Sequence, residues 1–151
     1  MDDKDRQIIR ALQRDGRMSN QDLAAAVNLS PSPCLRRVRN LEKAGIIRGY
    51  AARVDARAYG LAITAFVRIR LERHDEATVG TFEREVARME EVLECHVMTG
   101  QTDYQLRVVV ASLEAYEDFI RRRLHRLGGI GSIDTSFAYG TVKDSPVFPR
   151  D

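Results

Sequence analysis

Residues 19–45 read SNQDLAAAVNLSPSPCLRRVRNLEKAG and contain two helix signals separated by a break. Ser19 with Asp22 three positions later is typical of a helix start, because the serine hydroxyl can bind a free backbone N–H of the first turn. The Ser-Pro-Ser-Pro stretch cannot continue that helix, yet proline fits the first turn of a new one. The sequence therefore predicts two helices, 19–27 and 32–44, joined by a short turn.

The second of these helices is predicted to have two unlike sides. At 100° per residue, Cys34, Val38 and Leu41 fall on one side, and Arg37 flanks them. The opposite side is polar and basic, which favours a helix-turn-helix whose second helix enters the major groove of DNA. The residues predicted to contact bases or phosphates are Ser30, Ser32, Pro33, Arg36, Arg37, Arg39, Asn40 and Lys43. The alternative is a solvated face of a small helical bundle.

Another amphipathic helix is expected before this pair. Ile8, Ile9 and Leu12 form an apolar stripe at helical spacing, and Gly16 follows where the helix should end. The stretch 46–54, after the pair, is expected to be a short hairpin or an extended connector.

The rest of the chain changes to the period of a β-strand. Every second residue from Ile63 to Leu71 is apolar, and Arg68 and Arg70 lie between them, as a strand with two unlike faces requires. The elements expected after it are a helix around 79–89, strands at 92–98 and 104–111, a helix from Ser112 to about Leu127, and a last strand from about 133 to 142. This β-α-β-β-α-β order is that of a ferredoxin-like domain.

Length and charge fit this two-part reading. The chain has 151 residues, with 24 Lys and Arg against 22 Asp and Glu and 44% hydrophobic residues, which is typical of one or two globular domains. Residues 1–55 carry 11 basic and 7 acidic side chains, and residues 56–151 carry 13 and 15. The net charges are therefore +4 and −2, which indicates that a polyanion would bind at the front.

Cysteine usage and hydropathy predict the compartment. Cys34 and Cys95 are too few for a disulfide framework, so a reducing cytoplasm is expected. The near-apolar runs are interrupted well before the roughly 18 residues that a membrane span requires, and the N-terminus lacks an apolar run behind positive charge. We therefore expect a cytoplasmic, nucleoid-associated protein that is neither secreted nor inserted into a membrane.

The sequence predicts no metal, no cofactor and no enzyme activity. Cys95 and His96 are neighbours on a predicted strand and should point to opposite faces, while His74 and His125 lie outside any CxxC or HExxH spacing. The glycines of 128–131 follow a helix and precede a strand, which is the reverse of a dinucleotide-binding loop. No nucleophile is expected beside a base, and no carboxylate pair is expected to converge.

The stretch 99–104, TGQTDY, allows two interpretations. Its glycine, backbone N–H groups, carboxylate and aromatic ring could hold the two charged ends of a zwitterion. It could equally be a plain hairpin turn in which Asp103 binds its own backbone.

The run 29–50, LSPSPCLRRVRNLEKAGIIRGY, closely resembles the recognition region of the Lrp/AsnC family of transcription regulators, also called feast/famine regulators. Residues 15–20 (DGRMSN), 94–96 (ECH) and 100–104 (GQTDY) extend the resemblance over nearly the whole chain.

This resemblance implies an α+β protein with a winged helix-turn-helix DNA-binding domain (1–54), a linker (55–62) and a ferredoxin-like, RAM/ACT-like domain (63–151) that binds an effector and forms oligomers. It also implies a homodimer that binds a palindromic operator in double-stranded DNA and assembles into octamers. An amino-acid effector would bind between dimers. The implied effector-binding residues are Gly100, Thr102, Asp103 and Tyr104, with Thr135, Ser136 and Phe137 from the neighbouring subunit.

The sequence departs from the leucine-responsive relatives within the implied effector site. Gln101 and Thr102 stand where an Asp-aromatic pair is common, and Ser136 stands where an aromatic residue is frequent. The leading hypothesis is a regulator modulated by a small amino acid, which the sequence does not specify. The alternatives are an architectural DNA-binding protein without an effector, and an enzyme or metabolite carrier built on residues 56–151.

Overall fold

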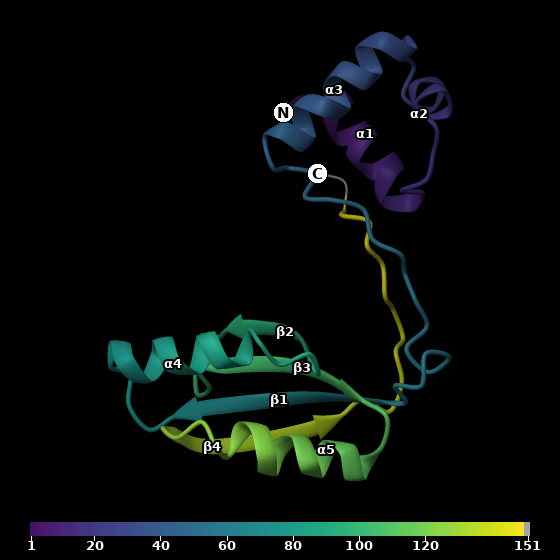
Figure 1. The fold of residues 1–151 in the computed structure, drawn as a ribbon. Coiled ribbons are helices and arrows are strands. Elements are labelled where there is room, and N and C mark those ends of the chain that lie inside the picture. The colour runs from purple at the N-terminus through teal and green to yellow at the C-terminus, as the bar shows by residue number, and fades with distance from the viewer. Residues whose placement is uncertain (150–151) are drawn as a thin grey trace. The chain divides into compact units, whose positions relative to one another are not determined.

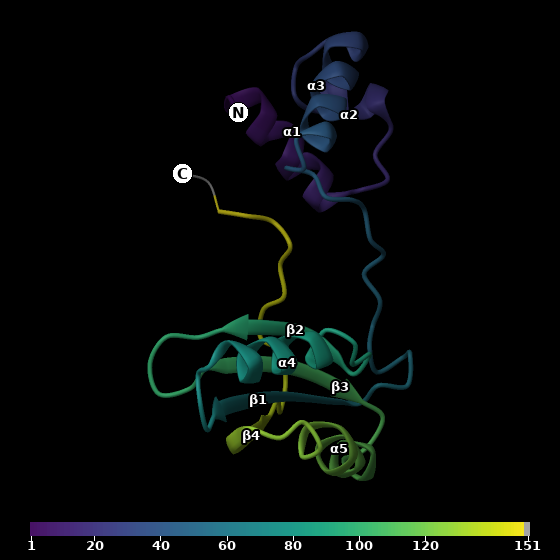
Figure 2. The same cartoon turned by 60° about the vertical axis from the view of Figure 1, so that its left-hand side comes forward.

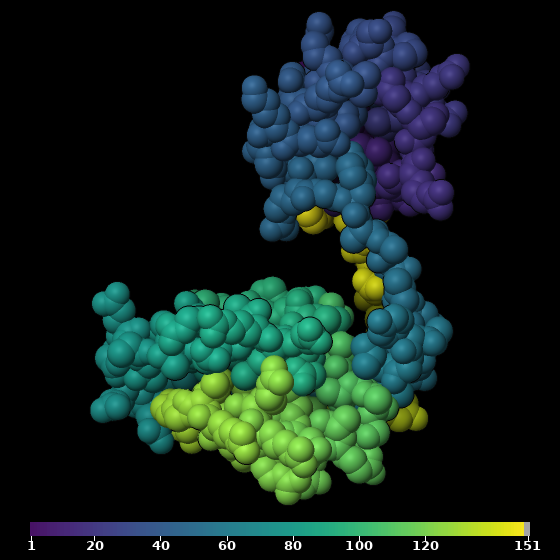
Figure 3. All heavy atoms as spheres, in the orientation of Figure 1, coloured from purple at the N-terminus to yellow at the C-terminus, as the bar shows by residue number. Residues whose placement is uncertain are grey.

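The computed structural model describes residues 1–149 of the chain, and these form two compact units (Figure 1, Figure 3). The helical unit consists of residues 1–53 together with the tail 142–149. The sheet unit consists of residues 54–141. The sequence assigned all of 63–151 to the second domain, whereas the structure groups the tail with the first.

The helical unit contains three helices, α1 (Asp3–Arg14), α2 (Asn20–Ala26) and α3 (Pro31–Lys43). Each of the first two begins at the cap that its sequence provides. The Asp2 carboxylate accepts the backbone N–H of Asp5, and the Ser19 hydroxyl accepts that of Asp22 at 3.1 Å. The Lys4 ammonium donates to the carbonyl of Val27 at 2.6 Å, where α2 ends, so α1 satisfies one of the free carbonyls of α2.

The two prolines explain how α3 begins. A helix leaves its first four N–H groups, here at positions 30–33, without a partner in the helix, but Pro31 and Pro33 have no N–H, which leaves only those of Ser30 and Ser32. The amide of Asn20, at the start of α2, donates to the carbonyl of Pro31 at 2.9 Å. The first turns of α2 and α3 are therefore joined directly.

A small apolar core holds the three helices together. Cys34 and Leu41 are buried on α3, and Val38 packs against the same core, which confirms the predicted stripe. The buried residues of this core are Ile8, Leu23, Ala24, Val27, Cys34 and Leu41. After α3 the stretch 46–54 is extended and contains no assigned strand, so it is the connector rather than the hairpin.

The sheet unit is ferredoxin-like, as predicted. Its elements are β1 (Ile63–Leu71), α4 (Glu76–Val86), β2 (Val92–Val97), β3 (Tyr104–Val110), α5 (Leu113–Phe119) and β4 (Ile130–Phe137). The strands are antiparallel and lie in the order β2-β3-β1-β4. A short π-helical segment, Ile120–Leu124, continues α5.

One face of this sheet is covered by α4 and α5 (Figure 1, Figure 2). Ala65, Val67 and Ile69 of β1 are fully buried under these helices, and the alternate residues Phe66 and Arg68 are exposed. The predicted period of two is therefore correct, and it separates an apolar face from a charged one.

The last strand begins and ends earlier than the sequence predicted. Gly128 and Gly129 adopt φ values of +56° and +74°, so the chain turns within two residues and Ile130 already pairs with Leu71. β4 ends at Phe137, which pairs with Ala65, rather than near 142; in this register β1, which begins at Ile63, offers no partner to residues 140–142.

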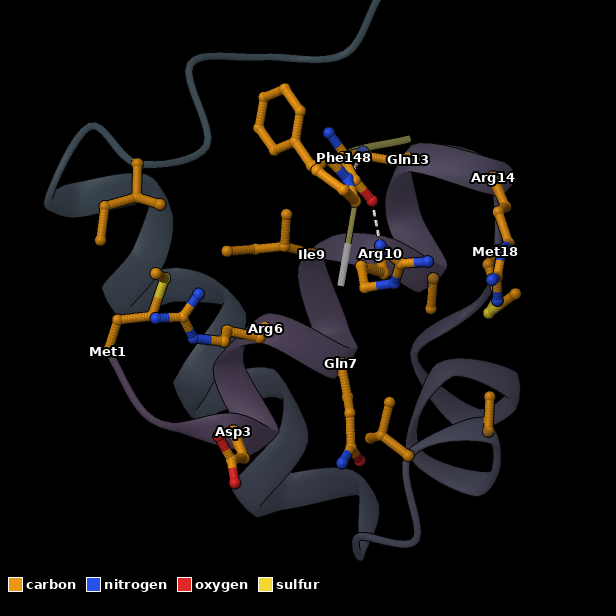
Figure 4. A pocket seen from close by; sticks show the side chains of 15 residues that line it. Met1, Asp3, Arg6, Gln7, Ile9, Arg10, Gln13, Arg14, Met18 and Phe148 are labelled. Atoms are coloured by element: carbon orange, nitrogen blue, oxygen red, sulfur yellow. Dashed lines mark hydrogen bonds between the residues drawn. The ribbon is translucent and has the colours of Figure 1, made fainter. Parts of the chain in front are cut away.

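The tail 142–149 contacts α1 within the helical unit. The Arg10 guanidinium donates to the carbonyl of Phe148, and the backbone N–H of Phe148 donates to Gln13 Oε1 at 3.2 Å (Figure 4). Arg53 and Asp144 form an ion pair at 2.8 Å. Phe148 and Pro149 border a groove of about 790 Å³ whose other lining residues come mainly from α1, with Met1, Met18, Ile46 and the end of α2.

Candidate functional site

The exposed side of α3 forms a single polar stripe. Ser32, Arg36, Arg39, Asn40 and Lys43 are all exposed, and at 100° per residue they fall within about 100° of one another. With a rise of 1.5 Å per residue the stripe is about 16 Å long, which matches the stretch of major groove that a recognition helix occupies.

Three cations of this stripe have no ion-pair partner among residues 1–149. They are Arg36, Arg39 and Lys43, and no hydrogen bond from their side chains to the described part of the chain is present. Their charges are therefore available to an external anion. Guanidinium groups can donate two hydrogen bonds to guanine or to phosphate oxygens, and an asparagine amide can donate to adenine N7 while it accepts from the adenine N6 amino group.

Arg37 has a different environment from the one predicted. Its guanidinium lies 2.8 Å from carboxylate oxygens of both Asp2 and Asp5, and its side chain is 33% exposed. The Asp5 N–H and then Arg37 hold the pKa of Asp2 below its usual value, and the hydrogen bonds to Asp5 and Asp2 raise the pKa of Arg37. Arg37 therefore joins α3 to α1 through one nitrogen of its guanidinium, and its predicted contact with DNA stays a prediction.

The other two predicted contacts lie at the start of α3. Ser30 is the N-cap residue, but its hydroxyl makes no capping hydrogen bond. Pro33 is half-buried in the first turn. The Ser30 hydroxyl is thus left beside the N-terminus of α3, where the helix dipole favours an anion.

The turn 99–103 is anchored to β1 through Asp103. The Asp103 N–H donates to the carbonyl of Ile69 at 2.9 Å, and one carboxylate oxygen accepts the N–H of Leu71 at 2.7 Å. The other oxygen lies 2.8 Å from Nε2 of His74. The Leu71 N–H, followed by His74, lowers the pKa of Asp103, so the carboxylate is charged at neutral pH.

Two other predicted effector residues in this region lie at different depths. Gly100 is exposed at φ +108° with open space around it. Tyr104 is only 4% exposed, its ring packs on Phe82 at 4.6 Å and its hydroxyl donates to Glu83 at 2.8 Å. Burial and Glu83 raise the pKa of Tyr104 to about 12. Within one chain Tyr104 is thus a core residue, while Gly100 is accessible.

The predicted effector residues on β4 lie apart from the turn within one chain. Thr135 pairs with Val67 and Phe137 with Ala65, whereas the turn lies beyond Ile69 on the other side of β1. Measured along β1 from Ile69 at the rise of a strand, the separation is about 7 Å for Thr135 and about 13 Å for Phe137. A single chain therefore does not bring the two groups of residues together.

The β4 residues have partners of their own in the sheet unit. The Thr135 hydroxyl is hydrogen-bonded to that of Tyr116, and the ring of Phe137, 49% exposed, packs edge-on against Tyr116. Arg68 donates to the Ser136 hydroxyl at 3.4 Å and pairs with Asp134 at 2.6 Å. Ser136 and Phe137 are therefore the accessible members of this group.

The sequence analysis missed His74, which it treated as an isolated histidine. The antiparallel pairing of β1 with β3 explains the contact, since it places Tyr104 opposite Ile69 and so brings Asp103 to the residues that follow β1. Among the described residues, no group of His, Cys, Asp and Glu side chains could hold a metal ion. No helix of residues 1–149 is long and apolar enough to cross a membrane.

The fold and the stripe on α3 define a class of protein, a two-domain DNA-binding transcription regulator. Residues 1–48 match the winged helix-turn-helix DNA-binding domain, and residues 64–148 match the Lrp/AsnC ligand binding domain. The second match covers more than half of the chain.

Full-length relatives agree with this result. The chain is 42% identical to the Bkd operon transcriptional regulator of Pseudomonas aeruginosa, over 94% of this chain and 93% of that protein. It is 39% identical to the leucine-responsive regulatory protein of Escherichia coli K12, over 96% and 88%. A transcriptional regulator of Neisseria meningitidis, solved as a complex with L-Met, superposes with a TM-score of 0.93 at 36% identity, over 99% and 96%. The chain belongs to the Lrp/AsnC family of transcription regulators.

Proposed function

We propose that the stripe on α3 reads an operator in the major groove. Ser32, Arg36, Arg39 and Asn40 would lie at base edges or phosphates, and Ser30 and Lys43 would bind the backbone. The unpaired cations of this face carry the proposal, because phosphate neutralisation supplies much of the affinity for DNA. Arg37 would act indirectly, by holding α3 on α1.

The family supports a dimer as the DNA-binding form. One helical unit with a few contacts would bind weakly, and two related by a two-fold axis would read palindromic half-sites about 34 Å apart. Assembly into octamers would raise the affinity for longer DNA through effective concentration. We also propose that the protein has no enzymatic activity and is located in the cytoplasm at the nucleoid.

The experiment for the DNA face uses Arg36→Ala and Arg39→Ala on an operator selected from random-sequence duplexes. Each variant should bind about tenfold more weakly, because a lost bidentate contact to a base costs about 1–3 kcal/mol. Binding is measured by fluorescence anisotropy at two salt concentrations. Arg88→Ala, which removes the same charge from the sheet unit, should bind like wild type. Unchanged affinity in both α3 variants would refute the assigned face.

For the sheet unit we propose an amino-acid effector at the turn, near Gly100, Thr102 and Asp103, with Ser136 and Phe137 of a neighbouring subunit. The support is the charged Asp103 carboxylate, which suits an ammonium group, and the L-Met complex of the Neisseria relative. Since the two groups of residues lie apart in one chain, binding would favour a particular assembly. Typical couplings of this kind are about 1–3 kcal/mol.

An effector-independent architectural role is the second candidate. It is favoured by the engagement of both Asp103 oxygens within the chain and by the burial of Tyr104. Thermal-shift measurements with each of the twenty amino acids separate the two. The regulator should show at least one clear rise in Tm that Asp103→Asn removes. The absence of any shift in all twenty would favour the architectural role.

A further inference from the structure

The Asp103 carboxylate offers only one of its oxygens to a ligand. Oδ2 accepts the N–H of Leu71, which belongs to the backbone at the end of β1 and is fixed by the sheet. The Asp103 side chain is 24% exposed. Oδ1, which no backbone group binds, is therefore the oxygen that an ammonium group arriving from solvent would approach.

His74 already occupies that approach. Its Nε2 lies 2.8 Å from Oδ1, while its side chain is 63% exposed. Among the described residues Asp103 is its only hydrogen-bond partner, and it lies in the loop between β1 and α4, outside both elements. The ring can therefore leave Asp103 by a side-chain rotation, at the cost of one hydrogen bond.

We propose that His74 tunes the effector site by competing with the ammonium group of the ligand for Asp103 Oδ1. The inference rests on the amino-acid-binding function proposed above and adds a residue outside the turn and outside β4. An imidazole N–H and an ammonium N–H are donors of the same kind, so each weakens the binding of the other. His74 acts on the ligand through Asp103 and is a specificity-determining residue in this sense.

The competition should depend on pH. The charged groups around the pair are Arg70, Arg73 and Asp75; the arginines keep their charge, and the hydrogen bond from the Thr78 N–H lowers the pKa of Asp75, which keeps that carboxylate ionised. Histidine is the side-chain type that changes charge between pH 5 and 8. Imidazolium binds a carboxylate more strongly than neutral imidazole does. The effector should therefore bind more weakly at pH 6 than at pH 8.

Isothermal titration calorimetry at pH 6 and pH 8 tests this. The probes are L-methionine, or the amino acid with the largest thermal shift in the screen, and its analogue without the amino group. Wild type should bind the amino acid about two- to fivefold more tightly at pH 8, the range expected for an exposed charge pair. His74→Ala should bind at pH 6 at least as tightly as wild type does at pH 8, because the neutral imidazole also competes for Asp103, and it should lose the pH dependence. The analogue without the amino group should be insensitive to the substitution.

Two further variants keep the result interpretable. His74→Gln preserves a neutral donor and should also lose the pH dependence, with an affinity between those of wild type and His74→Ala. His96→Ala is the matched control, because His96 lies 3.2 Å from the Glu94 carboxylate and is 60% exposed, yet lies on β2. It should behave like wild type.

The outcomes distinguish this inference from the function on which it rests. If wild type binds an amino acid and His74→Ala keeps the same affinity and pH dependence, the effector site stands and the role of His74 is refuted. Weaker binding of the amino acid by His74→Ala would likewise refute the proposed competition between His74 and the ammonium group. If neither wild type nor any variant binds one of the twenty amino acids, the effector function itself fails and takes this inference with it.

Discussion

Two adjacent arginines of α3, Arg36 and Arg37, have different surroundings although both are basic and neighbours in sequence. Arg36 is exposed and has no ion-pair partner among residues 1–149, whereas Arg37 lies between Asp2 and Asp5. Helical periodicity could place Arg37 beside the buried stripe, but it could not show which carboxylates meet it. Those carboxylates belong to α1, more than thirty residues earlier, so the contact depends on how the helices pack.

We predict that Arg37→Ala and Arg36→Ala separate stability from DNA contact. Arg37→Ala should lower the Tm of the helical unit, because two carboxylates at the start of α1 lose their shared partner. Arg36→Ala should leave Tm unchanged and weaken DNA binding. Differential scanning fluorimetry at low and high salt measures the first effect, which should shrink as salt screens the pair. A Tm of Arg37→Ala equal to that of wild type, with a DNA affinity as low as that of Arg36→Ala, would contradict the assignment.

At the scale of helices and strands, local sequence patterns predicted an element correctly wherever its hydrophobic period or its capping residue is complete. The prolines of 30–33 predicted the break before α3. The alternation of apolar residues in 63–71 predicted β1 and which of its side chains are buried. The pattern did not predict the ends of β4, because its start follows from the turn at Gly128 and Gly129 and its end depends on the register with β1. In the candidate site, too, the contacts that depend on the packing of distant segments could not be predicted from local patterns.

The burial of a side chain was harder to predict than the helix or strand in which it lies. Tyr104 was expected to face a ligand, but as the first residue of β3 it points to the covered face and packs on Phe82. Asp103, one position earlier, points the other way and reaches His74. Successive side chains of a strand point to opposite faces of the sheet. The face on which a residue next to a turn lies therefore depends on where the strand starts, and composition does not fix that position.

For the whole molecule, the least predictable feature is the route of the tail. Residues 142–149 have no helical or strand period, and the sequence placed them at the end of the second domain. Contacts of Phe148 with Arg10 and Gln13, and of Asp144 with Arg53, instead group them with the helical unit. The chain therefore passes between the two units twice, once through the linker and once after β4.

We predict that the tail stabilises α1. A chain ending at Lys143 loses the two backbone hydrogen bonds of Phe148 and leaves the groove beside α1 without its aromatic ring (Figure 4). Hydrogen exchange measured by mass spectrometry should therefore become faster in peptides covering 3–14 and stay unchanged in peptides covering 63–71, because β1 lies in the other unit. Phe148→Ala should reproduce part of the effect, since it removes the ring and keeps the backbone bonds. Equal exchange in α1 for the chain ending at Lys143 and for wild type would show that the tail contributes nothing to the stability of the helical unit.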